Sequence, residues 1–557
     1  MKHSVPRGDT YVWMTGGFLA LCVIMITGML LLIVVQGIGY FRPRPIDQFA
    51  LQGDAEAETI LGQVYSREDI PGDVAMTLGY DPAARPVRYL VRVGNRELFA
   101  QDFRWVNGPD VGMVTRPANA VCLERVEYGN AYGFVHSLRL GANRVIDSEI
   151  DAWDVFQKIH ETLRGLLEQI KAREKDELGE LNYQFEQHRL EVKALEYRLA
   201  NGRIDSASYE TRKTEIVAAM ANLEQSLRLH QAALDSMRRI AREPVLVLRA
   251  LGSSGEDLVD IPVASIVRAY KPNSMTATAT LRFYASKVWE FLSDDPREAN
   301  AEGGVFPAIF GTVMMVLLMT MVAVPFGVLA ALYLREYTSG GAMVRIVRIA
   351  VNNLAGVPSI VFGMFGLGFF VYFVGGGIDA LLYPERLPAP TYGTGGILWA
   401  SLTLSLLTVP VVIVATEEAL AAIPRGIREG SLALGATKWE TIRRVVLPSA
   451  TPGIMTGAIL AMARGAGEVA PLMITGVVKL ATEMPFDSHF PFFHLDRKFM
   501  HLGFHIYDIG FQTSNVEANI GMVYTTTLLL IGIILFLNMA AIMVRARLRE
   551  RYRTAGF

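Results

Sequence analysis

Long apolar runs separated by polar segments form the main pattern along this chain, and they predict its principal helices. A helix needs about 20 mostly apolar residues to cross the hydrocarbon core of a bilayer. Five runs exceed that length without an Asp, Glu, Lys or Arg, namely residues 10–41, 305–334, 349–378, 387–416 and 518–544. A sixth run, residues 445–478, is interrupted only by Arg464 and Glu468. The pattern therefore predicts six transmembrane helices.

The first apolar run has the position of a signal peptide. It is longer than the apolar region of such a peptide, and no small-x-small cleavage site precedes a charged mature start. We therefore expect this run to remain as a membrane anchor rather than to be cleaved.

Basic residues in the short connecting segments predict the orientation, because Lys and Arg favour the cytoplasmic side. The basic-rich segments lie before the first run, between the second and third, between the fourth and fifth, and after the sixth: Lys2, Arg7; Arg335, Arg345, Arg348; Arg425, Arg428, Lys438, Arg443, Arg444; Arg545, Arg547, Arg549, Arg551, Arg553. These segments all fall on one side of a six-helix topology. Both termini are therefore expected to be cytoplasmic.

The polar segment 42–296 is too long for a loop and is expected on the outer side of the membrane. Residues 46–150 alternate partly between apolar and polar positions and are bounded by Gly, Pro and Asp, which predicts strands. Residues 154–242 have a helical period instead. Residues 243–285 are again strand-like and are expected to return to the first part. The insert is therefore predicted to be α+β.

The helical part of the insert carries apolar residues at alternating steps of four and three. One set of seam positions precedes the turn Asn201–Asp205 and a second set follows it: Leu181, Phe185, His188, Val192, Leu195, Leu199; Ile216, Met220, Leu223, Leu227, His230, Leu234, Met237. Gly202 suits a helix end and Asp205 or Ser206 a helix start. The spacing predicts an antiparallel coiled-coil hairpin. His188 and His230 are read as polar residues that tune its register, with a ligand role as the alternative.

The composition and the absence of catalytic and ligand-binding motifs argue against several classes of protein. About half of the residues are apolar, and the net charge of −2 averages segments on two sides of a membrane. Cys22 lies in the first run and Cys122 in the insert, so no disulfide framework is expected. We find no metal-ligand cluster, no nucleophile with its base and no basic nucleic-acid patch. An enzyme and a nucleic-acid-binding protein are therefore disfavoured.

A charged segment lies between the fourth and fifth apolar runs and overlaps the start of the fifth. It covers residues 417–453, EEALAAIPRGIREGSLALGATKWETIRRVVLPSATPG. Pro424 breaks a first helical pattern, and an amphipathic run is predicted over residues 428–444. Gly435 lies in the middle of that run, where Gly costs about 1 kcal/mol relative to Ala. Its presence suggests a tight turn or the close approach of another surface. Leu447-Pro448 is expected to end the segment, because Pro disfavours a helix at the preceding residue.

The spacing of Glu429, Gly435 and Val445-x-Leu447-Pro448 resembles the EAA loop of ABC-importer permeases, E-A-A, three residues, G, nine residues, I-x-L-P. Gly430, Ser431 and Val445 depart from that pattern. The resemblance implies that the loop, residues 417–448, holds a coupling helix that docks on a cytoplasmic ATPase dimer through Glu429, Gly435, Ala436, Leu447 and Pro448. Alternating access follows from closure of the ATPase. The chain has no G-x-x-x-x-G-K-[ST], so ATP and Mg would be bound by the partner and no cofactor by this chain.

Two further stretches, NNLAGVPSIVFGMFGLG at 352–368 and LAMARGAGEVAPLMITG at 460–476, resemble the PstA family of phosphate-importer permeases. Gly465 and Val469 replace that family's Ala and Thr. The segment before residue 305 is similar, less specifically, to the amino-terminal extension of longer PstA proteins. The implied architecture is an all-α polytopic membrane protein with an ABC-importer permease fold. Its parts are residues 1–41, the extracytoplasmic insert 42–296 and the permease core 297–557.

The resemblance also implies a bacterial inner membrane location, a second permease subunit, an extracytoplasmic phosphate-binding protein and contact with membrane lipid. No nucleic-acid partner is expected. The insert would be periplasmic. Because the binding protein discriminates between anions in such systems, a permease for sulfate or molybdate remains an alternative. A membrane-anchored coiled-coil sensor is the alternative from another class.

Arg464 and Glu468 are four residues apart, which predicts that they share one helix face, and both are candidates for the substrate path. An ionised group at membrane depth usually faces a bundle interior or a watery cavity. Arg offers a planar fork of donors for phosphate oxygens, and Glu468 could neutralise it when the path is empty. A structural ion pair is the alternative. Asn352, Asn353 and Ser359 could line the same path, although close helix packing explains them better.

Overall fold

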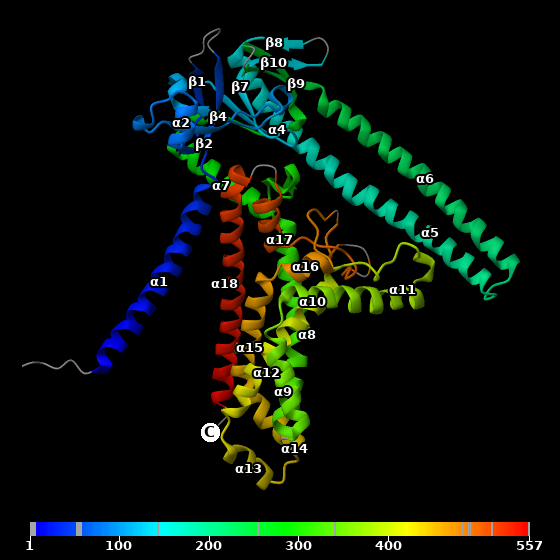
Figure 1. Cartoon of the computed structure of the whole chain (residues 1–557). Helices are drawn as coiled ribbons and strands as arrows, with labels where there is room; N and C mark the ends of the chain where they lie inside the picture. Colours follow the sequence, from blue (N-terminus) through cyan, green and yellow to red (C-terminus); the bar gives the residue numbers. More distant parts are fainter. Residues whose placement is uncertain are drawn as a thin grey trace, which may run out of the picture. The chain divides into compact units, whose positions relative to one another are not determined.

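The computed structural model describes residues 7–51, 58–141, 144–252, 255–338, 341–481, 483–487, 490, 492–513 and 516–554. The chain divides into two compact units (Figure 1). We call Phe41–Trp289 together with Pro384–Arg386 the sheet unit. The remainder, Met1–Tyr40, Glu290–Tyr383 and Leu387–Phe557, is the helical unit.

Two antiparallel sheets form the sheet unit. The first has the order β4-β3-β2-β1-β5, made of Phe103–Asn107, Val87–Arg92, Thr59–Asp69, Asp47–Leu51 and Val111–Thr115. The second has the order β10-β9-β7-β6-β11, made of Gly255–Pro262, Pro244–Gly252, Ala131–Leu140, Val121–Arg125 and Ile266–Tyr270, and β8 (Arg144–Ile146) pairs with β7. The segments before and after the helical part thus share one sheet, because β7 pairs with β9.

The core of the second sheet is covered by a helix. Helix α4 (Glu149–Arg173) buries Phe156 and Leu163 against Leu246 and Leu248 of β9. Burying such side chains removes apolar surface from water and is worth about 1.5–3 kcal/mol each. Residues 277–285 had been expected to be strand-like, and that prediction is wrong: Ala277–Ser293 forms helix α7. Its apolar positions repeat at helical spacing, which outweighs the β-branched threonines.

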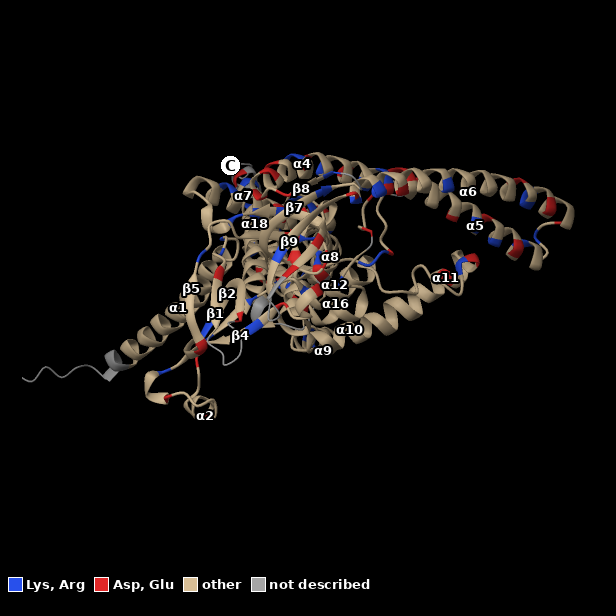
Figure 2. Ribbon diagram, turned by 90° about the horizontal axis from the view of Figure 1, so that it is seen from above, with Lys and Arg blue, Asp and Glu red and all other residues tan. Residues whose placement is uncertain are grey.

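A long helix pair projects from α4. The chain continues as a π-helical turn, Glu174–Leu178, and α5 (Gly179–Ala200), and returns as α6 (Ser206–Arg242). Gly202 has φ +66° and the side chain of Asp205 accepts from Ser208 N at 3.0 Å, so the turn has the cap chemistry that its sequence suggested. Leu195, Tyr209 and Ile216 are buried between α5 and α6. Lys, Arg, Asp and Glu interleave along both helices (Figure 2).

Six helices in the helical unit are long and apolar enough to cross a membrane, counted among the described residues. They are Tyr11–Gly39, Phe306–Tyr337, Ser359–Leu382, Ile397–Ala421, Lys438–Gly467 and Asn519–Arg547. The first lies in α1 (Arg7–Gly39) and the last in α18 (Val516–Thr554). The predicted number of six spans is confirmed by the length and composition of these helices.

Two of the runs do not coincide with single helices. The run 349–378 is divided, because α9 (Ala342–Leu354) ends before Pro358 and α10 (Ser359–Phe365) starts after it. The residue before a proline disfavours the helical conformation, which explains the break. The run 387–416 begins outside a helix, since α12 is Ile397–Ala421. The preceding segment is held by Asp379, which accepts from Tyr392 N at 2.9 Å and Gly393 N at 2.6 Å.

The spans pack through a shared apolar core. Helices α8 (Phe306–Leu332), α12, α15 (Leu447–Gly467) and α18 run side by side (Figure 1). Met315, Leu404 and Ala466 lie in one buried cluster that joins α8, α12 and α15. A Cβ atom at Gly457 would lie 2.8 Å from Ala415 Cβ, so this small residue allows α15 to approach α12 closely.

Candidate functional site

The charged segment between α12 and α15 is built from two short helices rather than one. Helix α13 (Arg425–Ala433) begins after Pro424, and α14 (Lys438–Thr441) begins after Thr437. The continuous amphipathic run predicted over residues 428–444 is therefore wrong. The periodicity of the side chains persists across the break, but the backbone turns at Gly435.

Gly435 closes α13 with a Schellman motif. Its φ is +87°, a left-handed conformation that L side chains rarely adopt. Gly435 N donates to Leu432 O at 3.0 Å, and Ala436 N donates to Ser431 O at 3.3 Å, which satisfies two carbonyls at the helix end. The tight turn that the sequence suggested at Gly435 is confirmed.

Helix α14 starts with a capping box. Thr437 Oγ1 accepts from Glu440 N at 3.3 Å, and Glu440 Oε2 accepts from Thr437 N at 2.9 Å. Ser431 Oγ of α13 and Thr441 Oγ1 of α14 are 2.9 Å apart and hydrogen-bonded. Reciprocal capping of this kind satisfies donors that a helix start leaves free. The two helices therefore form one defined unit, which we call the coupling loop, residues 417–448.

The expectation that Leu447-Pro448 ends this segment is wrong. A π-helical turn, Ile442–Val446, connects α14 directly to α15, and Pro448 lies in the first turn of α15. In a regular helix the ring of a proline clashes with the carbonyl four residues earlier, and here that residue, Arg444, lies in the π-helical turn. The coupling loop is therefore continuous with the fifth span.

The outer surface of the coupling loop is apolar and exposed. Leu434 is 90% exposed at the turn, and Trp439 is 57% exposed on α14. Ile427 and Leu432 are exposed on α13. Glu429 is exposed beside them, Ala436 is half-buried, and a Cβ at Gly435 would meet no atom within 4 Å. Leu447 and Pro448 are half-buried at the junction with α15.

Arg428 is a residue that motif matching passed over. Its guanidinium is mostly buried and contacts both α12 and the π-helical end of α8, Tyr333–Tyr337. A signal was present in the sequence, because Arg428 lies one turn into α13 and the carbonyls at the end of α12 need donors.

The predicted path pair is brought together, but not on one helix. Arg464 Nε lies 3.6 Å from Glu468 Oε1, and both side chains are partly buried. Helix α15 ends at Gly467, and Glu468 is extended with φ −82° and ψ 128°. The prediction that both residues share a helix face is wrong. Two glycines before Glu468 and Pro471 after it favour a helix end there.

Asn353 and Ser359 are not joined to this pair. Asn353 is exposed near the end of α9, and Ser359 starts α10. Among the described residues, the side chain of neither has a hydrogen bond to Arg464 or Glu468. Their neighbours Leu354 and Val357 pack against the cluster that contains Ala466.

A second polar cluster lies near the outer end predicted for the spans, and the sequence reading did not find it. Lys479 Nζ lies 3.0 Å from Asp508 Oδ2, and Asn300 Nδ2 lies 2.9 Å from Lys479 O and 3.4 Å from Asp508 Oδ2. His505, in α17 (Leu502–Tyr507), is buried beside Asp508. Burial lowers the pKa of His505 to about 4 and that of His501 to about 3.

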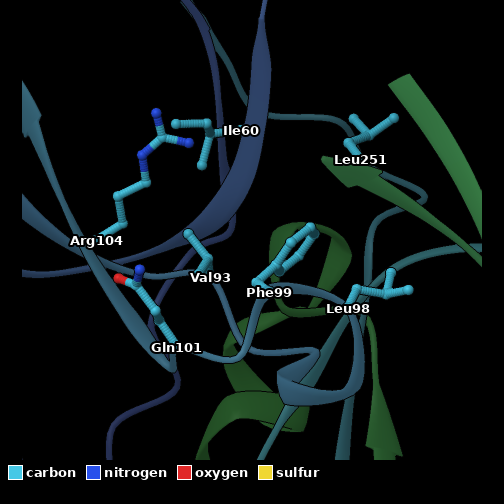
Figure 3. Close-up of a pocket in the computed structure, with 7 residues that line it drawn as sticks. All are labelled: Ile60, Val93, Leu98, Phe99, Gln101, Arg104 and Leu251. Carbon is cyan, nitrogen blue, oxygen red and sulfur yellow. The ribbon is translucent and has the colours of Figure 1, made fainter. Parts of the chain in front are cut away.

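The sheet unit contains an open pocket of about 290 Å³ (Figure 3). It is lined by Ile60, Val93, Leu98, Phe99, Gln101, Arg104 and Leu251. The charge of Arg104 is neutralised, because Arg104 Nη2 donates to Glu58 Oε2 at 2.9 Å. Among the described residues that line the pocket, Arg104 is the only charged one.

The remaining candidate ligand groups stay separate. His188 Nδ1 lies 3.3 Å from Glu191 Oε2, and His230 Nε2 lies 3.5 Å from Glu177 Oε2. Within the described part of the chain no three His, Cys, Asp or Glu side chains are grouped as metal ligands. Both cysteines are free thiols, and burial raises the pKa of Cys122 to about 12.

Comparison with known proteins places the coupling loop within a recognised family region. The family described as "Binding-protein-dependent transport system inner membrane component" matches residues 323–553. The probable ABC transporter permease protein YqgI of Bacillus subtilis (strain 168) is 30% identical over 258 residues, which cover 45% of this chain and 81% of that protein. The phosphate transport system permease protein PstA of Mycobacterium leprae (strain TN) is 37% identical over 195 residues, 34% of this chain and 58% of that protein.

PstA of Yersinia pestis is 34% identical over 188 residues, which cover 34% of this chain and 57% of that protein. Several other curated relatives, like the two PstA proteins, are spanned over only 50–64% of their length. Solved structures of the MetNI methionine ABC transporter align with TM-scores of 0.31 and 0.32 at 21% and 20% identity. They cover 44% and 47% of this chain and 94% and 98% of the solved chains.

Proposed function

Because the chain belongs to the family of binding-protein-dependent transport system inner membrane components, we propose that it is a permease subunit of an ATP-driven phosphate importer. It would be a transport subunit and not an enzyme, with ATP hydrolysed by a separate ATPase dimer. A second permease subunit and an extracytoplasmic phosphate-binding protein would complete the system. The proposal assigns an all-α permease fold to the helical unit.

The main support for this proposal is the conformation and exposed surface of the coupling loop. Its fixed motif positions lie around a Schellman turn that displays Leu434 and Trp439 to solvent. Exposed large apolar side chains beside a rigid turn are typical of a docking surface. We assign the ATPase contact to Glu429, Gly435 and Ala436, with Leu447 and Pro448 joining the loop to the fifth span.

Orientation follows from charge. The coupling loop and both termini would lie in the cytoplasm, and the sheet unit in the periplasm, because the basic-rich segments fall on one side. The helix pair α5–α6 would be an antiparallel coiled coil that projects from this periplasmic insert. Membrane lipid would cover the exposed apolar faces of the spans.

Arg464 and Glu468 are proposed to line the path. Their side chains are 34% and 22% exposed, so the pair is accessible although it lies at the end of a span. An anion with several oxygens could replace Glu468 at the Arg464 fork. Asn353 and Ser359 are proposed as neighbours of the path, because the segment between them packs near Ala466.

Phosphate is the proposed substrate because several relatives are named as phosphate transport permeases. Sulfate or molybdate is the alternative, since a guanidinium binds any tetrahedral oxyanion by the same geometry. The test is uptake of radiolabelled phosphate in a strain that lacks this chain, with sulfate uptake as the control. Loss of phosphate uptake alone, restored by the intact gene, is expected. Loss of sulfate uptake alone would overturn the substrate assignment.

The path assignment is tested by Arg464→Ala, Glu468→Ala and the double variant. If Arg464 binds the anion, both variants that lack it should lose at least tenfold in uptake, while the assembled complex persists. A purely structural pair predicts another order, because each single change leaves one charge unpaired and the double change relieves it. Recovery of uptake in the double variant would contradict the path assignment.

A further inference from the structure

The guanidinium of Arg428 makes three hydrogen bonds that join three elements of the helical unit. Nη1 donates to Ile423 O at 2.7 Å, and Nη2 donates to Leu420 O at 2.7 Å. Nη2 also lies 3.0 Å from Glu336 Oε1 in an ion pair whose side chains are only 20% and 12% exposed. Arg428 belongs to α13 and Glu336 to the π-helical end of α8. Leu420 O lies in the last turn of α12, and Ile423 O lies in the turn that follows it.

The elements that Arg428 joins are themselves well anchored. Leu420 and Ile423 are buried with Leu332 of α8 and with Ile442 and Val446 of the π-helical turn before α15. The carbonyls at the end of α12 have no partner inside that helix, so an outside donor fixes their direction. The two carbonyls that accept from the guanidinium thus belong to residues of an apolar cluster shared by three spans.

A second contact reaches the same end of α8 from the other half of the coupling loop. Lys438 Nζ of α14 lies 5.1 Å from the centre of the Tyr337 ring, a cation–π contact. Glu336 and Tyr337 are adjacent, so α13 and α14 both contact the turn Tyr333–Tyr337. π-Helical turns frequently occur at functional positions in helices.

We infer that Arg428 is the positioning residue through which movement of the coupling loop reaches the second and fourth spans. The inference rests on the proposed function and names a residue for its coupling step. Exposed side chains such as Leu434 would meet the ATPase. Arg428 faces the opposite way, into the permease, and holds α13 to α8 and α12 so that they move together.

The chemistry of the three acceptors requires an arginine. A guanidinium presents several donors in one rigid plane and stays charged, whereas an ammonium is a point charge on a flexible stem. Lysine could satisfy one acceptor well but not three separated ones. Glutamine lacks the charge for Glu336 and has only one amide group for two carbonyls.

The test uses the complete complex in proteoliposomes, with Arg428→Gln, Arg428→Lys, Glu336→Gln and the control Arg345→Gln. Arg345 is an exposed arginine of α9 whose side chain has no hydrogen bond or ion pair to another described residue. The measured quantity is the ratio of phosphate taken up to ATP hydrolysed. The amount of assembled complex is determined separately for each variant. We expect a loss of at least tenfold for Arg428→Gln, smaller losses for Arg428→Lys and Glu336→Gln, and the wild-type ratio for the control.

A structural role alone would lower the amount of assembled complex and leave the ratio per complex unchanged. A wild-type ratio in Arg428→Gln complexes would overturn the inference. If wild-type complexes themselves fail to couple ATP hydrolysis to uptake, the proposed function fails instead, so the two failures are distinguishable.

Discussion

Arg428 and Glu429 are neighbours in the sequence, and the structure gives them opposite surroundings. The arginine is mostly buried against carbonyls and a carboxylate, whereas the glutamate is exposed. Motif spacing identified Glu429 and Gly435, because both hold fixed positions in a recognisable pattern. It could not identify Arg428, whose partner Glu336 is 92 residues away in the sequence. Local turn chemistry at Gly435 was predictable, but long-range polar pairing was not.

The same limit applies to the outer polar cluster. Nothing in the sequence near His505 indicates that Lys479 and Asn300 meet Asp508, since these residues come from three distant segments. The cluster nevertheless has a measurable consequence at the residue scale, because buried histidines resist protonation.

The protein should become less stable as the pH falls, because His501 and His505 are buried around α17 in their neutral form. The pKa of His505 is about 4, against an ordinary 6.5, because burial disfavours the imidazolium. Between these two pH values the unfolded chain binds the proton more tightly than the folded chain does. The contribution of His505 to the free energy of unfolding is therefore fully present above pH 6.5 and is lost as the pH falls toward 4. One pKa unit corresponds to about 1.4 kcal/mol, so the decline should amount to a few kcal/mol.

The measurement is the thermal unfolding midpoint of the detergent-solubilised protein between neutral pH and pH 4. His505→Gln should flatten the dependence on pH, and addition of His501→Gln should flatten it further. Gln keeps a polar side chain of similar length without a titratable proton. An unchanged pH dependence in the double variant would show that other groups control acid stability.

At the scale of elements, apolar run length predicted the number of spans but not their ends. Proline and glycine chemistry set two of those ends, at Pro358 and after Gly467. The amphipathic pattern over residues 428–444 concealed a turn, because helical periodicity of side chains can continue across a change of backbone direction. The π-helical turns had no sequence signal that periodicity could detect.

Substitutions at Gly435 should reduce phosphate uptake according to how poorly the new residue tolerates the left-handed backbone of the coupling loop. Its φ of +87° should make alanine unfavourable by about 1–2 kcal/mol, whereas asparagine tolerates left-handed backbone better. Uptake should therefore decrease in the order Gly, Asn, Ala, with Gly435→Trp lowest because it also places a large side chain on the docking surface. Radiolabelled phosphate uptake, normalised to protein inserted in the membrane, measures this order.

Insertion itself should be unchanged in all three variants, because no atom lies within 4 Å of a Cβ at this position. Equal loss in the Asn and Ala variants would contradict the turn explanation. It would indicate that the bare backbone, and not its conformation, is what the partner requires.

At the scale of the whole molecule, composition separated a membrane part from a polar insert, and the structure divides into a helical unit and a sheet unit. Strand pairing within the sheet unit could not be predicted, because β7 and β9 pair across a helical segment of about a hundred residues. The heptad pattern did predict a helix pair with a turn at 201–205, since cap residues and apolar spacing agreed there. Its packing as a supercoil stays a prediction.

The helix pair should be separable from transport. Residues 154–242 cannot be removed whole, because Phe156, Leu163 and Ala241 belong to the core of the second sheet. Replacement of residues 179–228 by a short Gly/Ser linker is compatible with the fold, since Glu177 Oε2 and His230 Nε2 lie 3.5 Å apart. The shortened chain should assemble with its partners and retain part of the phosphate uptake.

Deletion of all of residues 154–242 serves as the comparison and should prevent folding of the sheet unit. Co-purification of the partner subunits measures assembly for both deletions. If the shorter deletion abolished assembly, the helix pair would be part of the interface and not an accessory.

The central claim is that energy is released on a partner and reaches this chain only as movement of the coupling loop. Accumulation of radiolabelled phosphate in proteoliposomes tests it most directly, with the complete complex or with this chain alone, each with and without ATP. The account predicts accumulation only for the complete complex supplied with ATP. Accumulation by this chain alone without ATP would contradict it.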